Sequence, residues 1–242
     1  MRYLATVSYV GTNYAGWQVQ PDADSIQAEL ELVISRVLNT PTKIFGSGRT
    51  DAGVHSLGQT FHFDAKKIED LEKFRYSLNC LLKDDIHINN IKKTRSDFHA
   101  RYEVKEKVYS YLINMGEANP FEKDRVYDLM RKLDTKKMKE ALLFFKGRHD
   151  FRNFTTKEAD DNHFVREIFD ASLYKDGDRI KLTFKGDGFM RYMVRLIVGT
   201  LVEVGLGKLE PMEISKLLTP VKRNVVSYKA PACGLYLEKV IY

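Results

Sequence analysis

Apolar residues fall on alternate positions at the start of the chain and then change to a helical period. The alternation at residues 3–9 predicts a strand. Residues 26–37 place apolar side chains at helical intervals, and Ser25 is a favoured N-cap residue, so a helix is predicted there. The other elements predicted for the first half are strands at 42–45, 59–64 and 86–91 and a helix at 71–81.

The second half of the chain repeats this order of elements. Strands are predicted at 104–113, 165–174, 179–185 and 235–241, and helices at 135–145, 189–204 and 211–218. Both halves thus have the order β-α-β-β-α-β, the split βαβ arrangement. The sequence predicts an α+β fold of two similar halves, 1–103 and 104–242, with mostly antiparallel mixed sheets joined around a central cleft.

A glycine-rich segment separates two of the strands predicted in the first half. Residues 46–55 read GSGRTDAGVH, with three glycines around Asp51 and a cation at Arg49. The spacing fits neither a Walker loop nor a dinucleotide-binding loop. Glycine lets a ligand approach the backbone closely, so the loop is suited to present the carboxylate of Asp51. The alternative is an Asx-type turn in which Asp51 only bonds nearby amides.

An arginine lies within the apolar pattern of the helix predicted at 189–204. Arg195 shares one helical stripe with Val198 and Val202, which draws it toward the apolar side. A buried guanidinium keeps its charge and needs an acidic partner, for which Asp51 is a candidate. Periodicity alone leaves open the alternative of an arginine that extends from an amphipathic helix into solvent.

Two tyrosines lie on one face of the strand predicted at 104–113. Tyr109 and Tyr111 are two residues apart, so both side chains point to the same side of the sheet. Strand tyrosines commonly serve only in packing. A tyrosine ring can also hold a uracil by stacking, and both interpretations stay open at this point.

The segment GRTDAGVH resembles the signature of the TruA family of tRNA pseudouridine synthases. The resemblance extends from about residue 3 to residue 241 and includes the Tyr-x-Tyr strand and the Met-Val-Arg-x-x-x-Gly helix. It implies that Asp51 is the nucleophile and that Arg195 is the active-site arginine. It further implies that Tyr109 contacts the target base, that Arg49 assists base flipping, and that Leu235 lines the base pocket.

The resemblance also implies a reaction and a substrate. The reaction would convert uridine to pseudouridine at positions 38, 39 and 40 of the tRNA anticodon arm, and the enzyme would be a homodimer. Isomerisation needs no redox step and loses no group, so we expect no cofactor and no metal. The order of bond changes stays open among three alternatives. In these, Asp51 attacks C1′ of the sugar, attacks C6 of the base, or abstracts a 2′ proton. The base that removes the C5 proton is also not identified.

Composition agrees with a nucleic-acid substrate. The 242 residues carry a formal net charge of +6 and an isoelectric point near 9.1, which favours a polyanionic partner. Cys80 and Cys233 stand apart, and the six histidines show no zinc-ligand spacing. No apolar run approaches the roughly 20 residues of a membrane span, and no signal-peptide pattern begins the chain, so the cytoplasm is the expected compartment.

Two other functions are compatible with parts of these observations. A noncatalytic RNA-binding protein with duplicated split-βαβ units would explain the charge and the fold, but it gives no reason for an acid in the centre of the loop. A hydrolytic N-glycosidase would use the same carboxylate and release free uracil. The mass of the treated tRNA distinguishes the isomerase from the glycosidase.

Overall fold

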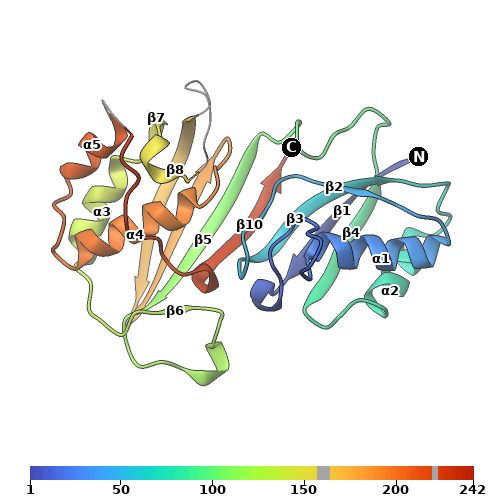
Figure 1. Ribbon diagram of the computed structural model, residues 1–242, viewed down its shortest axis with the longest axis horizontal. Coiled ribbons are helices and arrows are strands. Elements are labelled where there is room, and N and C mark those ends of the chain that lie inside the picture. Colours follow the sequence, from blue (N-terminus) through green and yellow to red (C-terminus); the bar gives the residue numbers. More distant parts are fainter. Residues whose placement is uncertain (157–163, 220–222) are drawn as a thin grey trace. The chain divides into compact units, whose positions relative to one another are not determined.

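The computed structural model describes residues 1–156, 164–219 and 223–242. It divides into two compact units (Figure 1). Unit 1 comprises Met1–Lys105 together with Tyr236–Tyr242, and unit 2 comprises Glu106–Leu235. Most of the last strand, which the sequence pattern places in the second half, is grouped here with unit 1, and its backbone pairs in parallel with a strand of that unit.

Unit 1 contains a sheet with the strand order β4-β1-β3-β10, and β2 pairs with β3. Its helices α1 and α2 lie on one face of this sheet (Figure 1). The elements are β1 (Arg2–Tyr9), α1 (Ile26–Leu38), β2 (Ile44–Gly46), β3 (His55–Asp64), α2 (Leu71–Asn79), β4 (Ile86–Lys93) and β10 (Leu235–Ile241). Each falls where the sequence pattern predicted a strand or a helix.

Local chemistry sets the ends of the unit 1 helices. Ser25 caps α1 through a hydrogen bond that its side chain accepts from the Ala28 amide. Asn39, at a φ of 47°, ends the same helix in the left-handed conformation that asparagine tolerates. Asp70 caps α2 by accepting from the Lys73 amide.

The core of unit 1 lies between the helices and the sheet. Phe61 and Phe63 of β3 are fully buried there, and Tyr3 stacks on Phe63 with ring centroids 5.5 Å apart. Trp17 packs against Phe61 from the loop that precedes α1. These contacts fix β3 against the helix layer, and β3 begins directly after the glycine-rich segment.

Unit 2 contains a sheet with the order β5-β9-β8-β7, and β6 pairs in parallel with β5. Helices α3 and α4 cover one face of this sheet (Figure 1). The elements are β5 (Glu106–Asn114), β6 (Tyr127–Asp128), α3 (Thr135–Leu143), β7 (Gly147–Asp150), β8 (Val165–Asp176), β9 (Arg179–Gly186), α4 (Met193–Gly205) and α5 (Glu213–Leu218). Four 3-10 turns complete the described elements: η1 (Gly11–Asn13), η2 (Pro120–Glu122), η3 (Arg152–Phe154) and η4 (Ala232–Gly234).

The sequence pattern missed three details of unit 2. Helix α4 begins at Met193, four residues later than predicted, because Tyr192 has a φ of 63° and interrupts the right-handed helix. Strands β6 and β7 were not predicted, since one has two residues and the other, Gly147–Asp150, carries no apolar alternation.

The predicted fold class is confirmed. The described strands pair mostly antiparallel, and parallel pairs occur between β10 and β3 and between β5 and β6. In the described ranges, no helix has the length and apolar character needed to cross a bilayer.

Candidate active site

The segment that leads from β2 to Asp51 is tightly packed in unit 1. A Cβ atom at Gly46 would lie 2.7 Å from the Trp17 indole, so only glycine fits there. The side chain of Gln59 holds the next two residues: its Oε1 lies 2.5 Å from Ser47 Oγ, and its Nε2 donates to the Gly48 carbonyl at 3.0 Å. The first half of the loop is thereby bound to β3.

Thr50, the residue before Asp51, is held from two sides. Its hydroxyl lies 2.9 Å from the buried Tyr9 hydroxyl. Its carbonyl accepts a hydrogen bond of 3.1 Å from the Trp17 amide. Gly16, at a φ of 102°, lets the backbone pass this carbonyl, since a Cβ there would lie 2.5 Å from the Thr50 oxygen. The backbone that enters Asp51 is therefore fixed by β1 and by the segment that precedes α1.

The segment after Asp51 is also fixed. The Val54 amide donates to the Asp51 carbonyl at 3.2 Å, which closes a turn around the carboxylate-bearing residue. Gly53 takes a φ of 75° within this turn. The Gly11 amide donates to His55 Nδ1 at 3.1 Å, and a Cβ at Gly11 would lie 2.0 Å from the Val54 carbonyl oxygen. Asp51 is thus presented on a rigid loop, as a preorganised functional group requires.

Two side chains near this loop differ in their exposure. Tyr9 is 4% exposed, and burial raises the pKa of its phenol well above the usual range, so its hydroxyl stays neutral and available for hydrogen bonding. Arg49 is exposed, and the structure gives its guanidinium no partner among the described residues. Arg49 can therefore contact a ligand without first breaking an ion pair in the described ranges.

Arg195 lies in unit 2, and its side chain is buried. It is 9% exposed, which decides against an arginine that extends into solvent. Its Nε donates to the Ala230 carbonyl at 2.8 Å, while the Ala230 amide donates to the Arg195 carbonyl at 3.0 Å. Its guanidinium carbon lies 5.3 Å from the centre of the Tyr192 ring. This bonding fixes one edge of the guanidinium and orients the group.

The other two predicted residues of unit 2 are buried as well. Tyr109 is 8% exposed and meets Phe189 edge to face, with ring centroids 5.1 Å apart. Leu235 is 5% exposed and follows Gly234, where a Cβ would lie 2.6 Å from the Tyr111 ring. Tyr111 itself is fully buried, and its hydroxyl donates to the Pro231 carbonyl at 2.7 Å.

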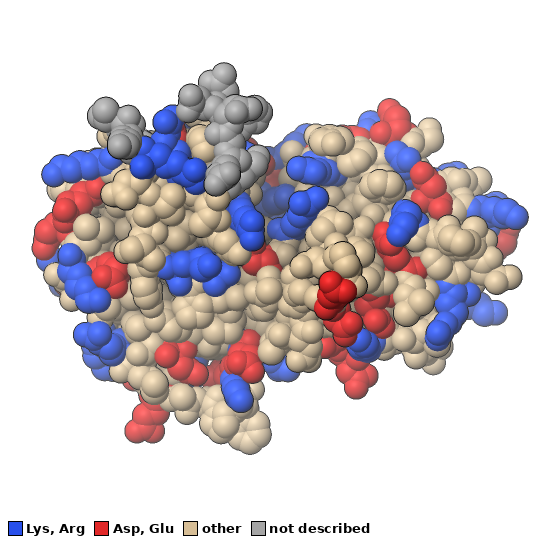
Figure 2. Space-filling model, in the orientation of Figure 1, with Lys and Arg blue, Asp and Glu red and all other residues tan. Residues whose placement is uncertain are grey.

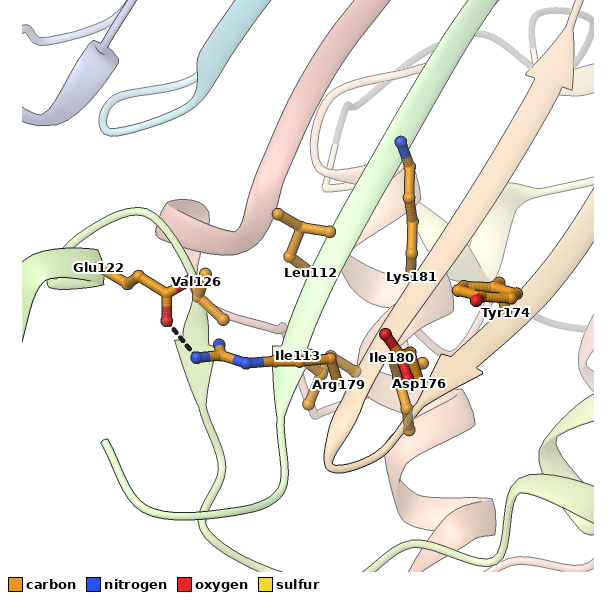
Figure 3. A pocket seen from close by; sticks show the side chains of 9 residues that line it. All are labelled: Leu112, Ile113, Glu122, Val126, Tyr174, Asp176, Arg179, Ile180 and Lys181. Atoms are coloured by element: carbon orange, nitrogen blue, oxygen red, sulfur yellow. Dashed lines mark hydrogen bonds and ion pairs between the residues drawn. The ribbon is translucent and has the colours of Figure 1, made fainter. Parts of the chain in front are cut away.

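A separate cavity of about 290 Å³ lies in unit 2 (Figure 3). None of the site residues predicted from the sequence lines it. Its lining residues are Leu112, Ile113, Glu122, Val126, Tyr174, Asp176, Arg179, Ile180 and Lys181. Glu122 forms an ion pair with Arg179 at its edge, as Figure 3 shows. The cavity is therefore not the place where the predicted chemistry would occur.

Sequence reasoning missed the residues that support Asp51. Tyr9 and Gln59 were predicted only as strand residues, and Gly16 lay outside every predicted element. The one usable signal was the occurrence of Gly11 and Gly16 close together before the first helix. In the described ranges, no cluster of three His, Cys, Asp or Glu side chains is arranged to hold a metal ion.

An α+β fold that presents a carboxylate on a rigid glycine loop is typical of an enzyme that acts through that carboxylate. The family model described as tRNA pseudouridine synthase matches residues 5–103 and again residues 141–242. The chain belongs to this family. Pseudouridine synthases are isomerases, so the expectation of an isomerase is confirmed, and so is the resemblance on which it rested.

Relatives match over the full length of the chain. A protein of Exiguobacterium sp. named tRNA pseudouridine synthase A is 42% identical over 241 residues, covering 100% of this chain and 98% of the relative. A protein with the same name from Brevibacillus brevis is 39% identical and covers 100% of this chain and 99% of its own length. Another from Mycoplasma genitalium is 38% identical and covers 100% of this chain and 98% of its own length. Among solved structures, "Crystal Structure of a Cbf5-Nop10-Gar1 Complex" gives a TM-score of 0.37 at 12% identity, covering 82% of this chain and 54% of that one; this similarity is too low to support an argument.

Proposed function

We propose that this protein isomerises uridine to pseudouridine at positions 38, 39 and 40 in the anticodon stem-loop of tRNA, with Asp51 as the nucleophile. The observation that carries the proposal is the rigid presentation of Asp51. Both flanks of this residue are fixed, by Tyr9 and Trp17 on one side and by Gly11 on the other. A loop that only closed a turn would not need contacts from three separate segments.

The reaction is balanced within the nucleotide. The N1–C1′ bond breaks, the uracil turns, and a C5–C1′ bond forms. The proton lost from C5 is matched by the proton that N1 carries in the product. A carboxylate is suited to such a step, because it can act on an electrophilic carbon as it does in glycosidic cleavage.

We propose roles for the other predicted residues on the basis of their chemistry. Arg195 keeps a fixed charge and would hold the Asp51 carboxylate in its ionised form at neutral pH. Tyr109 would contact the uracil ring, and Leu235 would line the base pocket. Arg49, exposed on the same loop as Asp51, would enter the space left in the stem when the base flips out.

The substrate proposal is supported by charge and by the family. The net charge of +6 favours a phosphate-rich partner, and the matched relatives carry tRNA in their names. We further propose a homodimer with one tRNA extending across both subunits, and the cytoplasm stays the expected compartment. Size-exclusion chromatography with light scattering, with and without tRNA, tests the dimer directly.

The decisive experiment maps pseudouridine chemically in tRNA incubated with wild-type protein or with Asp51→Asn. We expect product at positions 38–40 with the wild type and none with the variant, while tRNA affinity is largely retained, because one acceptor among many contacts changes. Asp22→Asn, at an exposed aspartate, is the matched control and should behave as wild type. Near-normal turnover by Asp51→Asn would remove Asp51 from the mechanism.

The mass of the treated tRNA separates the proposal from its alternatives. Isomerisation leaves the mass unchanged, whereas an N-glycosidase would lower it by the loss of uracil. A noncatalytic RNA-binding protein would bind tRNA and leave both the mass and the chemical map unchanged.

A further inference from the structure

One aromatic ring in unit 2 is surrounded by three cations. Lys229 Nζ lies 4.0 Å from the centre of the Tyr192 ring. The guanidinium carbon of Arg191 lies 4.9 Å from the same point, and that of Arg195 lies 5.3 Å from it. We call Arg191, Tyr192, Arg195 and Lys229 the Tyr192 cluster. Cation–π contacts account for single cations on such a ring, but three on one ring form an unusually dense positive site.

The backbone around Lys229 is held in place by the helix beside it. A Cβ at Gly199 would lie 2.2 Å from the Tyr228 carbonyl oxygen, so the chain passes α4 at a point where only glycine allows it. On the other side of Lys229, Ala230 exchanges two hydrogen bonds with Arg195. Lys229 therefore lies between two neighbours whose backbone is held against α4.

Arg191 and Tyr192 are also held by the fold. The hydroxyl of Thr155 donates to the Arg191 carbonyl at 2.9 Å, and Arg191 Nη2 donates to the Tyr192 hydroxyl at 3.2 Å. Tyr192 takes a φ of 63°, which a bulky residue rarely adopts. Such a conformation persists where the surrounding structure imposes it, and this places the ring between the three cations.

The cluster carries positive charge that nearby carboxylates do not neutralise at its exposed side. Arg191 and Lys229 are both exposed, and over residues 1–156, 164–219 and 223–242 neither forms an ion pair with an acidic side chain. In Figure 2, lysine and arginine side chains gather on unit 2 near α4 and the segment that leads to β10, whereas acidic side chains gather around the segment with η2 and β6. An anion is the partner that this arrangement favours.

We propose that the Tyr192 cluster binds a backbone phosphate of the RNA substrate, with Arg191 and Lys229 as the contacting groups and the Tyr192 ring as their platform. The inference rests on the proposed function, which supplies the RNA. Phosphate contacts position a nucleic acid without reading its sequence. Arg191 and Lys229 are therefore positioning residues, and their loss should raise KM for tRNA more than it lowers kcat.

The test measures tRNA affinity as a function of salt for Lys229→Gln and Arg191→Gln. Each substitution removes one charge and keeps a polar side chain of similar length. We expect the slope of log K against log salt to become shallower by about 0.7 to 1 for each variant, with weaker binding at low salt. Lys139→Gln is the matched control, because Lys139 is an exposed lysine on α3 and lies outside the cluster.

Two substitutions of Tyr192 test the role of the ring. Tyr192→Asn removes the ring while keeping a residue type that tolerates positive φ, so the backbone is not penalised. We expect its slope to shift toward those of Lys229→Gln and Arg191→Gln. Tyr192→Phe keeps the ring and should stay closer to the wild type. Thermal unfolding of each variant confirms that the fold is intact.

The outcomes separate this inference from the proposed function. One outcome would overturn the inference alone. In it, the wild type forms pseudouridine, but Lys229→Gln and Arg191→Gln show the same salt slopes and tRNA affinities as Lys139→Gln. If the wild type bound tRNA but formed no pseudouridine, the proposed function would fail, and a reduced slope in the two variants would still support the phosphate site. Wild-type protein that failed to bind tRNA would overturn both.

Discussion

The side-chain oxygens of Tyr9 and Thr50 lie 2.9 Å apart in a buried hydrogen bond that connects strand β1 to the residue before Asp51. This bond lies within unit 1 and joins positions separated by 41 residues. The precision with which Asp51 is presented thus depends on a core strand that has no chemical role of its own. Groups that fix a reactive side chain in this way affect turnover through geometry.

Replacing Tyr9 with phenylalanine should weaken this presentation. Loss of the hydroxyl removes the buried hydrogen bond to Thr50 Oγ1. We expect this to lower the free energy of unfolding by about 1 kcal/mol. We expect kcat to fall further than this modest loss of stability explains, because the loop gains freedom. Denaturant unfolding and single-turnover rates at saturating tRNA measure the two effects.

Tyr3→Phe is the matched control for this prediction. The Tyr3 hydroxyl accepts a hydrogen bond of 2.9 Å from the Ile68 amide. Neither residue belongs to the glycine-rich segment 46–55. Its loss should lower stability by a similar amount and spare turnover. Equal kcat values for Tyr9→Phe and Tyr3→Phe would show that the Tyr9–Thr50 bond does not serve the reaction.

Gly16→Ala should disrupt the loop by steric overlap. The added Cβ would lie 2.5 Å from the Thr50 carbonyl oxygen, at a φ of 102° that alanine resists. We expect a loss of stability of about 2 kcal/mol or more and a strong fall in turnover, because Thr50 must move. Gly207→Ala separates the two causes, since Gly207 has a φ of 74° but no atom within 4 Å of its Cβ position. If Gly16→Ala and Gly207→Ala had comparable effects, backbone strain at positive φ would explain the loss, and steric overlap with Thr50 would not be needed.

The fold could be predicted from the sequence wherever a local pattern determines the element. Helix α1 was predicted from its apolar period and its Ser25 cap, and the neighbouring strands β8 and β9 were predicted at 165–174 and 179–185. The start of α4 was missed because Tyr192 adopts positive φ, which tertiary packing imposes and no propensity indicates. The parallel pairing of β10 with β3 is a long-range contact that the pattern does not contain.

The site shows the same division between local and long-range information. The composition of the loop indicated that it is suited to present Asp51, whereas the apolar stripe left a buried and a solvent-exposed Arg195 both open. The structure shows that Arg195 is buried. The stripe did not indicate what fixes the guanidinium. Its partner Ala230 lies 35 residues away in a segment without a periodic pattern. The assigned chemical roles of these residues stay predictions.

Arg195→Ala should reduce stability as well as activity. The substitution removes the hydrogen bond from Nε to the Ala230 carbonyl and leaves a space beside a buried segment of α4. We expect the free energy of unfolding to fall by about 2 to 4 kcal/mol, because a large buried side chain and its hydrogen bond are both lost. The control is Arg101→Ala, at an exposed arginine of unit 1, which should leave unfolding nearly unchanged. An unfolding midpoint of Arg195→Ala equal to that of the wild type would contradict the burial argument.

His62 should make unit 1 less stable at acidic pH. It is 1% exposed, its Nδ1 accepts a hydrogen bond of 3.1 Å from the Ala100 amide, and its ring stacks on Phe45 with centroids 5.0 Å apart. Burial, together with the charges of Arg2 and His99, lowers the pKa of the His62 imidazole to about 4, and Asp64 opposes this only weakly. The unfolded chain, with an imidazole pKa near 6.5, binds this proton first.

The stability that neutral His62 contributes is therefore complete above about pH 6.5 and is lost as the pH falls toward 4. We expect this residue to account for a decrease on the order of 2 kcal/mol across that window. NMR titration of the imidazole should show a neutral ring down to about pH 4, and His62→Gln should flatten the pH dependence of unfolding between 4 and 6.5. His87→Gln, at an exposed histidine of β4, should leave that dependence in place. An imidazole that protonates near pH 6.5 in the folded protein would contradict the prediction, because its charge would then add no difference between the folded and unfolded chain.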